Sequence, residues 1–272
     1  MATNADNEGF QKSADRYAAY LETPEGRLRL DLAFANLQEF LPQAMRSLRA
    51  LDVGCGTGAI AVRLARLGLH ISLLDSSQQM LDCAERTTRE AGVSETIVEL
   101  KRSDAAHLEE IFQAGSFDVV LCHNVLEYVG DPAKVLLGAA RMLRNSSAIL
   151  SVLVRNRAGE VLKAAIQAGD LSLADSSLTA EWGYESLYGG RVRLFTSHRL
   201  HAMMKAASLT VSTERGVRTV ADYLPQRISR RDEYERIFEL EHKLGSQTEF
   251  AAVARYTQCI AHRADPPMEN AA

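Results

Sequence analysis

The sequence predicts a single α/β domain over residues 1–272, built on a mostly parallel sheet of seven strands with helices on both faces. Two observations predict this class. Short apolar runs of strand length alternate with amphipathic stretches of helical length along most of the chain. The first apolar run also ends in a glycine-rich turn that leads directly into a helical pattern. A hydrophobic content of 46% is enough for a sizeable core.

The glycine-rich turn is LDVGCGTG, residues 51–58. Its first residues end a buried strand, Gly54, Gly56 and Gly58 follow at alternate positions, and residues 59–68 have helical periodicity. Glycine lets a backbone turn sharply and approach a ligand that a Cβ would exclude. The next helix directs free N–H groups and partial positive charge at that ligand. The stretch therefore predicts the start of a nucleotide-binding βαβ unit.

The spacing of the glycines distinguishes among nucleotide ligands. A dinucleotide-binding turn has the pattern G-x-G-x-x-G, whereas both gaps here hold one residue. Asp52 lies two residues before the first glycine, and the second strand, residues 69–75, ends in Asp75. This combination resembles the first motif of the class I methyltransferases, which bind S-adenosylmethionine (AdoMet). An acidic side chain at Asp75 can accept hydrogen bonds from both ribose hydroxyls of an adenosine.

Asp75 has a second interpretation, as the N-cap of the helix predicted over residues 76–92. Ser76 and Ser77 suit that role as well, so we assign the cap to one of these serines and the ribose to Asp75. Met80 lies in the first turn of the same helix. It is expected either to lie on the adenine or to pack in the core.

The N-terminal residues 9–45 are expected to form helices over the cofactor site. Residues 1–8 are polar and predict no structure, and a short helix is expected over 10–20. A stronger helix is predicted over 23–42, with threonine as its cap, proline at its first position and a second proline at its end. Arg29 in this helix has two interpretations, a solvated arginine or a contact to the AdoMet carboxylate.

Two further candidates follow the third strand, which lies within residues 94–108 and ends near Lys101. Ser103 and Asp104 therefore fall at the C-terminal edge of the sheet, where open α/β sheets bind their ligands. Asp104 is expected either to meet the adenine amine or to cap a helix.

His123 follows the fourth strand, for which residues 117–122 supply the buried run. A lone histidine often has a structural role, but this one is expected at the catalytic edge, beside the transferred methyl group. It becomes the candidate base if the acceptor is a phenol or an amine. A helix over 133–144 and a fifth strand over 148–156 are predicted next.

An insertion over residues 157–195 separates the fifth strand from the sixth. A helix of about ten residues is predicted to open it, followed by an irregular segment, and such insertions form lids over α/β active sites. A dimer arm or a surface loop is the alternative. A capped helix over 196–209, a sixth strand over 210–218, a helix over 230–244 and an antiparallel last strand over 249–263 complete the chain.

The composition excludes several classes of protein. No run of 18 apolar residues predicts a membrane span, and the N-terminus has no secretory signal pattern. The four cysteines are scattered without metal-ligand spacing, which predicts reduced thiols, no metal and a cytoplasmic location. The formal net charge of −4 does not indicate a nucleic-acid-binding protein, although a local basic patch can serve that function.

One local basic stretch is present in this acidic chain. Between residues 215 and 231 a single acid, Asp222, accompanies five arginines: Arg215, Arg218, Arg227, Arg230 and Arg231. Arginine binds carboxylates and phosphates bidentately. Arg218, at a predicted strand end, is the candidate for a substrate carboxylate, and Arg230 and Arg231 are the candidates for backbone phosphates. The alternative is a solvated helix start.

Several segments resemble the bacterial tRNA 5-carboxymethoxyuridine methyltransferases. They include GRLR around Arg29, the glycine loop, LLDSSQQM and LCHNVLEYVGDP, and the narrower signature lies in GVRTVADYL, RRDEYERIFELE and ARYTQCIAHR. The resemblance implies the Rossmann-like class I methyltransferase fold, with a lid after strand five. It implies AdoMet contacts at seven positions: Arg29, Gly54, Cys55, Asp75, Ser103, Asp104 and His123.

The full set of expected cofactor-binding residues combines both arguments: Arg29, Asp52, Gly54, Cys55, Gly56, Asp75, Ser76, Met80, Ser103, Asp104 and His123. The predicted reaction transfers a methyl group from AdoMet and leaves S-adenosylhomocysteine. A carboxylate acceptor is ionised near neutral pH and needs no base, so positioning supplies much of the rate. The implied partner is tRNA. The alternatives are a small-molecule O- or N-methyltransferase and a non-catalytic AdoMet-binding protein.

Overall fold

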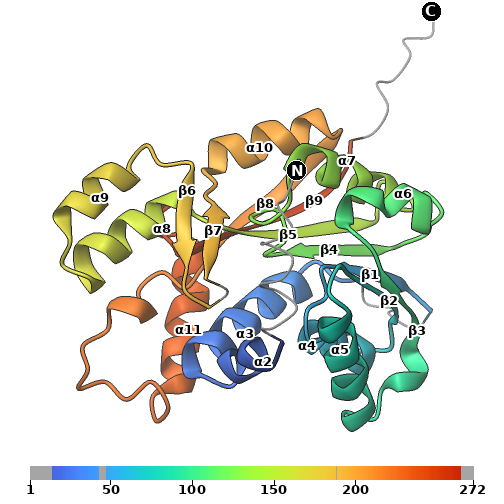
Figure 1. The fold of residues 1–272 in the computed structure, drawn as a ribbon, viewed down its shortest axis with the longest axis horizontal. Coiled ribbons are helices and arrows are strands. Elements are labelled where there is room, and N and C mark those ends of the chain that lie inside the picture. Colours follow the sequence, from blue (N-terminus) through green and yellow to red (C-terminus); the bar gives the residue numbers. More distant parts are fainter. Residues whose placement is uncertain (1–13, 43–46, 188, 265–272) are drawn as a thin grey trace, which may run out of the picture.

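The computed structural model describes residues 14–42, 47–187 and 189–264, and its centre is a seven-stranded sheet of order β3-β2-β1-β4-β5-β9-β8 (Figure 1). The bounds of the strands are β1 Arg49–Val53, β2 His70–Asp75, β3 Ile97–Arg102, β4 Val119–His123, β5 Ile149–Arg155, β8 Leu209–Val217 and β9 Tyr256–Arg263. The first five strands run parallel to one another, and β9 runs antiparallel to both β5 and β8. The predicted sheet and its antiparallel last strand are confirmed.

Helices cover both faces of this sheet (Figure 1). Their bounds are α2 Ala14–Leu21, α3 Pro24–Gln38, α4 Ala59–Arg66, α5 Gln78–Glu90, α6 Leu108–Ile111, α7 Pro132–Met142, α10 Ser197–Ala206, α11 Tyr234–Gly245 and α12 Thr248–Ala251. One apolar cluster joins α6, α7 and α10 to the sheet, and a second joins α3, α4 and α5 to its other face. Side-chain caps begin four of these helices: Thr23, Ser77, Asp131 and Thr196. The caps of α3, α5 and α10 were predicted, and Asp131 was not.

Three predicted boundaries are wrong. Helix α3 ends at Gln38 rather than near Pro42, because two tight turns, each closed by an i→i+3 hydrogen bond, follow it. Helix α11 begins at Tyr234 rather than at Arg230. The last strand begins at Tyr256, because the alanine-rich residues before it, which the apolar pattern assigned to the strand, form the short helix α12.

The insertion is more regular than the sequence predicted. Its opening helix is present as α8 Arg157–Leu162, extended by a π-helical turn over 163–167, and a further helix, α9, spans Leu171–Ser177. The expected irregular segment also holds a hairpin of β6 Trp182–Glu185 and β7 Gly190–Arg193. The alternating sequences WGYE and RVR around a glycine turn are typical of such a hairpin. Its role as a lid stays a prediction.

In the segments that the structure describes, no helix is long and apolar enough to cross a membrane. All four cysteines are buried and none forms a disulfide. The predictions for residues 1–8 and for the first part of the helix over 10–20 concern positions outside the described residues, whereas Ala14–Leu21 is helical as expected.

Helix α11 fixes the loop that follows β8. Glu241 of this helix is fully buried, and its carboxylate accepts hydrogen bonds from the backbone N–H groups of Thr219, Val220 and Ala221. Arg218, just before these residues, has a left-handed backbone conformation with φ 61°. The contact with α11 therefore determines where the Arg218 side chain lies.

We predict that Glu241→Ala lowers the free energy of unfolding by about 3 kcal/mol or more, because three backbone N–H groups are left buried without an acceptor. Glu239→Ala, an exposed site on the same helix, should change it by less than about 0.5 kcal/mol. Urea unfolding followed by circular dichroism measures both. Equal stability of the two variants would show that the loop does not depend on this carboxylate.

Candidate active site

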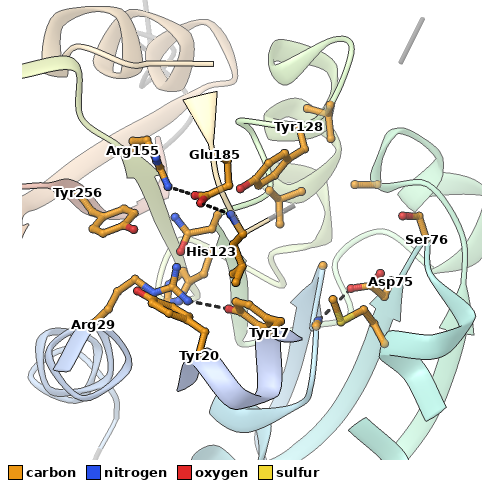
Figure 2. A pocket seen from close by; sticks show the side chains of 18 of the residues that line it. Tyr17, Tyr20, Arg29, Asp75, Ser76, His123, Tyr128, Arg155, Glu185 and Tyr256 are labelled. Carbon is orange, nitrogen blue, oxygen red and sulfur yellow. Dashed lines mark hydrogen bonds and ion pairs between the residues drawn. The ribbon is translucent and has the colours of Figure 1, made fainter. Parts of the chain in front are cut away.

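A cavity of about 540 Å³ opens at the carboxyl edge of the parallel strands (Figure 2). Nine of the eleven expected cofactor-binding residues line it: Arg29, Gly54, Gly56, Asp75, Ser76, Met80, Ser103, Asp104 and His123. The other two, Asp52 and Cys55, line a smaller adjoining cavity of about 50 Å³. The fold thus brings together residues from α3, the glycine loop and the ends of three strands.

The glycine loop has the left-handed backbone conformation that glycine adopts without steric cost. Gly54, Gly56 and Gly58 have φ of 69°, 54° and 74°. A Cβ at Gly54 would overlap the Val125 side chain. The N–H groups of Gly54 and Cys55 donate to the Leu74 carbonyl at 2.7 and 3.0 Å, which holds the loop against the end of β2. The backbone therefore forms an open, fixed cradle at the cavity floor.

Asp75 is oriented by backbone donors. Its Oδ2 accepts from the Gly56 N–H at 2.9 Å and its Oδ1 from the Ser77 N–H at 2.9 Å. Burial raises the pKa of this carboxyl. The cap of α5 is Ser77, whose hydroxyl accepts from the Met80 N–H, as the sequence predicted. The Asp75 carboxylate thus stands at the cavity with its orientation fixed.

Met80 has the core packing that was one of its two expected roles, and its contact with adenine stays a prediction. The side chain is buried and packs with Ala14 and Cys83, and it also lines the cavity. Asp104 is exposed at the cavity edge, and its Oδ1 accepts from the Ala106 N–H at 2.8 Å. The capping alternative for Asp104 is therefore present, and its contact to adenine stays a prediction.

Asp52 fits a cationic ligand beneath the glycine loop. The side chain is 2% exposed, and its Oδ2 has no hydrogen-bond partner among the described residues. Burial and the neighbouring Asp75 raise its pKa to about 7. A buried carboxylate oxygen without a donor is costly, and an ammonium group such as that of AdoMet would supply the donor. The cradle and this orphaned oxygen together fit the methionine end of the cofactor.

Arg29 is not a solvated arginine. Its side chain is buried, and Nη2 donates to the Tyr17 hydroxyl at 2.8 Å. The guanidinium also lies over the rings of Tyr17, Tyr20 and Tyr256 at 5.1 to 5.6 Å from their centroids. Figure 2 shows it directed at the cavity beside these rings. This placement suits the predicted contact to a carboxylate.

His123 is neutral at physiological pH. Its Nε2 lies 2.8 Å from the Ser151 hydroxyl. Burial and the positive charge of Arg29 lower its pKa to about 3. A base this weak accepts little charge in a transition state. His123 is therefore suited to hydrogen bonding and packing at the strand end rather than to proton abstraction.

The sequence did not indicate half of the residues that form the far wall of the cavity. Four buried guanidiniums form it, and we call them the arginine wall: Arg29, Arg155, Arg218 and Arg255. Only Arg29 and Arg218 were candidates. Arg155 lies at the end of β5, and Arg255 lies directly before β9. An arginine next to an apolar strand is the sequence signal that could have identified both residues.

The arginine wall is held by three carboxylates. Glu160 lies 3.1 and 3.0 Å from two of its guanidiniums, and Asp222 lies 3.0 and 3.2 Å from two. The third carboxylate, Glu185, comes from strand β6 of the hairpin and pairs with Arg155 (Figure 2). Among the described groups, the wall thus has four guanidiniums to three ion-paired carboxylates, an excess of one positive charge. A fourth carboxyl, the buried Glu127, also interacts with Arg155, but burial raises its pKa and so disfavours its charged form.

The pKa of Tyr256 reflects this positive charge. Its hydroxyl belongs to a buried side chain at the centre of the wall (Figure 2). Burial alone would raise its pKa, but Arg155, Arg29 and the other guanidiniums outweigh burial and lower the pKa to about 8. An anionic group is therefore favoured at this end of the cavity.

The remaining arginines of the basic stretch do not line the cavity. Arg230 is not the exposed arginine that the sequence predicted for a phosphate. It is half-buried, and its Nη2 donates to the carbonyls of Ala221 and Leu224 at 3.2 and 3.1 Å, because the chain folds back over it before α11. Arg231 is exposed, and Arg215 pairs with Glu39 at 2.8 Å.

A group of possible metal ligands lies elsewhere in the described part of the chain. The donor atoms of His201, Glu214 and Cys259 lie within 4.8 Å of one another, on α10, β8 and β9. None of these residues lines the cavity. His201 and Glu214 pair at 2.8 Å, so the group is accounted for as an ion pair beside a buried thiol.

Comparison with known proteins agrees with this geometry. Residues 51–151 match the model of a methyltransferase domain family, and this range contains the glycine loop, Asp75 and His123. The chain is therefore an AdoMet-dependent methyltransferase of the class I fold. Over nearly its whole length it is similar to the tRNA 5-carboxymethoxyuridine methyltransferase of Escherichia coli K12, with 27% identity over 269 residues, 94% of this chain and 97% of that protein.

Other similar proteins match either a shorter part of this chain or a similar length at lower identity. A ubiquinone biosynthesis O-methyltransferase of Hahella chejuensis is 40% identical over 101 residues, which are 37% of this chain and 41% of that enzyme. The crystal structure of magnesium protoporphyrin IX methyltransferase from Synechocystis with bound S-adenosylhomocysteine has a TM-score of 0.63 at 14% identity, covering 94% of this chain and 97% of that one. A possible histamine N-methyltransferase from Thermotoga maritima has a TM-score of 0.61 at 16% identity, covering 94% and 98%. These structures establish the fold.

We predict that Asp75→Ala weakens AdoMet binding by about 1.5–3 kcal/mol, because it removes hydrogen bonds between a charged acceptor and the ribose. Isothermal titration calorimetry with AdoMet and with S-adenosylhomocysteine measures the loss. Asp82→Ala, at an exposed site on the following helix α5, is the matched control and should bind as the wild type does. Unchanged affinity in a folded Asp75→Ala protein would refute the ribose contact.

Proposed function

We propose that this methyltransferase transfers the methyl group of AdoMet to the carboxylate of 5-carboxymethoxyuridine in tRNA. The observation that carries the proposal is the arginine wall, whose excess positive charge favours an anionic group at the end of the cavity opposite the glycine loop. The similarity along 94% of the chain to a protein with this named activity supports it. A tRNA substrate implies a cytoplasmic enzyme.

The cavity has two chemically different ends that suit two ligands. Asp52, Asp75 and the glycine loop supply acceptors and backbone donors for the cofactor. The arginine wall supplies donors for carboxylates. We assign Arg29 to the AdoMet carboxylate, because among the residues of the arginine wall it also lines the small cavity beside the glycine loop. We assign Arg218 to the substrate carboxylate.

A carboxylate acceptor needs no base, which agrees with the lowered pKa of His123. Bound AdoMet supplies an electrophilic methyl group on a sulfonium. The substrate carboxyl, with a reference pKa of about 4, is already ionised at neutral pH. The protein then has to orient the two ligands and exclude water, and orientation alone can supply about 7–11 kcal/mol of a barrier. His123, neutral beside Ser151, fits a role in packing the ligands.

A small-molecule O-methyltransferase is the second candidate. The local identity of 40% to a ubiquinone biosynthesis O-methyltransferase favours it, as do the tyrosines along the cavity, Tyr17, Tyr20 and Tyr128. A phenol acceptor needs a base, however, and His123 with its pKa of about 3 is a poor one. A wall of buried arginines also exceeds what an uncharged substrate requires.

The proposal is tested with labelled AdoMet and total tRNA from a strain that lacks its own enzyme of this activity. Nucleoside analysis after the reaction should show the label in the methylated form of 5-carboxymethoxyuridine. Phenolic small molecules serve as competing substrates. Labelling of these molecules with no labelled nucleoside would contradict the tRNA proposal and favour the second candidate.

We predict that Arg218→Ala lowers kcat/KM for methyl transfer by about 10- to 100-fold, the range expected when a carboxylate loses a charged hydrogen-bond donor. AdoMet affinity should stay within about twofold of the wild type, because the cofactor is assigned to other residues. Arg236→Ala is the matched control, since this arginine is 84% exposed on α11 and lies outside the cavity. Full activity of a folded Arg218→Ala enzyme would remove Arg218 from the site.

We predict that KM for the anionic substrate rises with pH above about 8, where the Tyr256 phenol loses its proton. The neutral phenol predominates below this pKa, and the phenolate above it cancels the excess positive charge of the wall. If only the neutral form binds substrate, KM rises about tenfold per pH unit in that range. Tyr256→Phe should make KM independent of pH between 7 and 9, and a rise retained in this variant would assign the effect elsewhere.

A further inference from the structure

The hairpin of the insertion presents an unusual outer face. Its register pairs Trp182 with Arg193 and Tyr184 with Arg191 across the two strands. Side chains of a strand alternate between faces, so these four residues share one face. The opposite face turns inward, because Val192 is fully buried. We call Trp182, Tyr184, Arg191 and Arg193 the aromatic–arginine face.

Both aromatic rings of this face are accessible. The Tyr184 side chain is 66% exposed and Trp182 is 38% exposed. The guanidiniums of Arg191 and Arg193 lie over the Trp182 ring at 4.4 and 4.5 Å from its centroid. Such layers of aromatic rings and planar cations present flat surfaces to solvent. No aliphatic side chain belongs to the face.

The surroundings of the face are positively charged. Burial and the nearby Arg199 lower the pKa of Arg193, which shows that two guanidiniums lie close together there. Glu181 and Asp131 provide opposing charge near Arg193. Three arginines thus face two carboxylates, and an anionic partner is favoured over a cationic one.

The face adjoins the cavity. At the hairpin tip, Glu185, Ser186 and Leu187 line the cavity itself. Arg16 donates to the Leu187 carbonyl at 3.1 Å and connects the tip to α2, beside the cavity mouth. A polymer that delivers one of its units into the cavity can therefore continue along the hairpin.

We propose that the aromatic–arginine face binds the unpaired RNA nucleotides that flank the methylated uridine. This inference rests on the proposed function. A base must leave its stack to enter a cavity, so its neighbours become available for contact. Proteins hold such nucleotides by stacking their bases on aromatic rings and guanidinium planes and by placing arginines near the phosphates. Tyr184 and Trp182 supply the stacking surfaces, and Arg191 and Arg193 supply the positive charge.

Trp182 makes this contact directly measurable, because it is the only tryptophan of the chain. Titration of the full-length protein with unmodified tRNA and with a short single-stranded RNA should quench its fluorescence, and the effect should weaken with added salt. Tyr184→Ala should reduce the RNA affinity about 5- to 100-fold, the range for loss of one stacked base. Unchanged fluorescence at saturating RNA would overturn the inference.

Kinetic measurements on variants separate the contribution of base stacking from that of positive charge. Trp182→Ala and Tyr184→Ala should raise KM for tRNA while leaving kcat and the activity on the free nucleoside unchanged. Trp182→Phe should restore most of the affinity. Arg191→Ala should reduce the salt dependence of tRNA binding by about one phosphate contact, whereas Arg191→Lys should keep that dependence and lose affinity. Arg236→Ala, which removes an arginine 84% exposed on α11, is the charge-matched control and should behave as the wild type.

The two proposals fail in distinguishable ways. If the wild type methylates the nucleoside in tRNA and the face variants keep the wild-type KM, the face has no RNA role and the proposed function stands. If tRNA carrying the nucleoside is bound at Trp182 but never methylated, the proposed function fails and the RNA-binding face stands.

Discussion

The buried arginine wall is the constraint on which the rest of the site depends. Burying a guanidinium costs several kcal/mol unless carboxylates and hydrogen bonds offset the loss of water. The three partners come from different parts of the chain: Glu160 from α8, Glu185 from the hairpin and Asp222 from the loop after β8. The insertion and the C-terminal strands must therefore pack together for the wall to form, and the shape of the cavity follows from that packing.

The positive charge of the wall helps to lower the pKa of two groups, Tyr256 and His123. Tyr256 becomes more acidic because the guanidiniums stabilise its phenolate, with a pKa of about 8. His123 becomes a weaker base because burial and Arg29 oppose its protonation, with a pKa of about 3. Both lowered pKa values fit a site for a methyl acceptor that is already anionic when it binds. Asp52 and Asp75 lie at the other end of the cavity, beside the glycine loop. The difference in charge between the two ends is the basis for assigning the two ligands.

The sequence predicted the elements whose signal is local. The glycine spacing, Asp75 at a strand end and the serine cap of α5 are each set by neighbouring residues, and the structure has them as expected. Arg155 and Arg255 were missed because their partners, Glu185 and Asp222, are about 30 residues distant along the chain. Arg230 was misplaced because backbone carbonyls, which no sequence pattern displays, hold its guanidinium. The positions of these arginines thus depend on tertiary contacts, which local sequence periodicity does not indicate.

The central claim is that the wall selects a carboxylate as the methyl acceptor. Treatment of the labelled tRNA product with mild alkali tests this most directly, because a methyl ester is hydrolysed to methanol under conditions that leave N-methyl and ether O-methyl groups intact. If the acceptor is a carboxylate, the transferred label becomes volatile and the nucleoside returns to its carboxylate form. Label that stays on the nucleoside after alkali would contradict the claim and would place the acceptor on another atom.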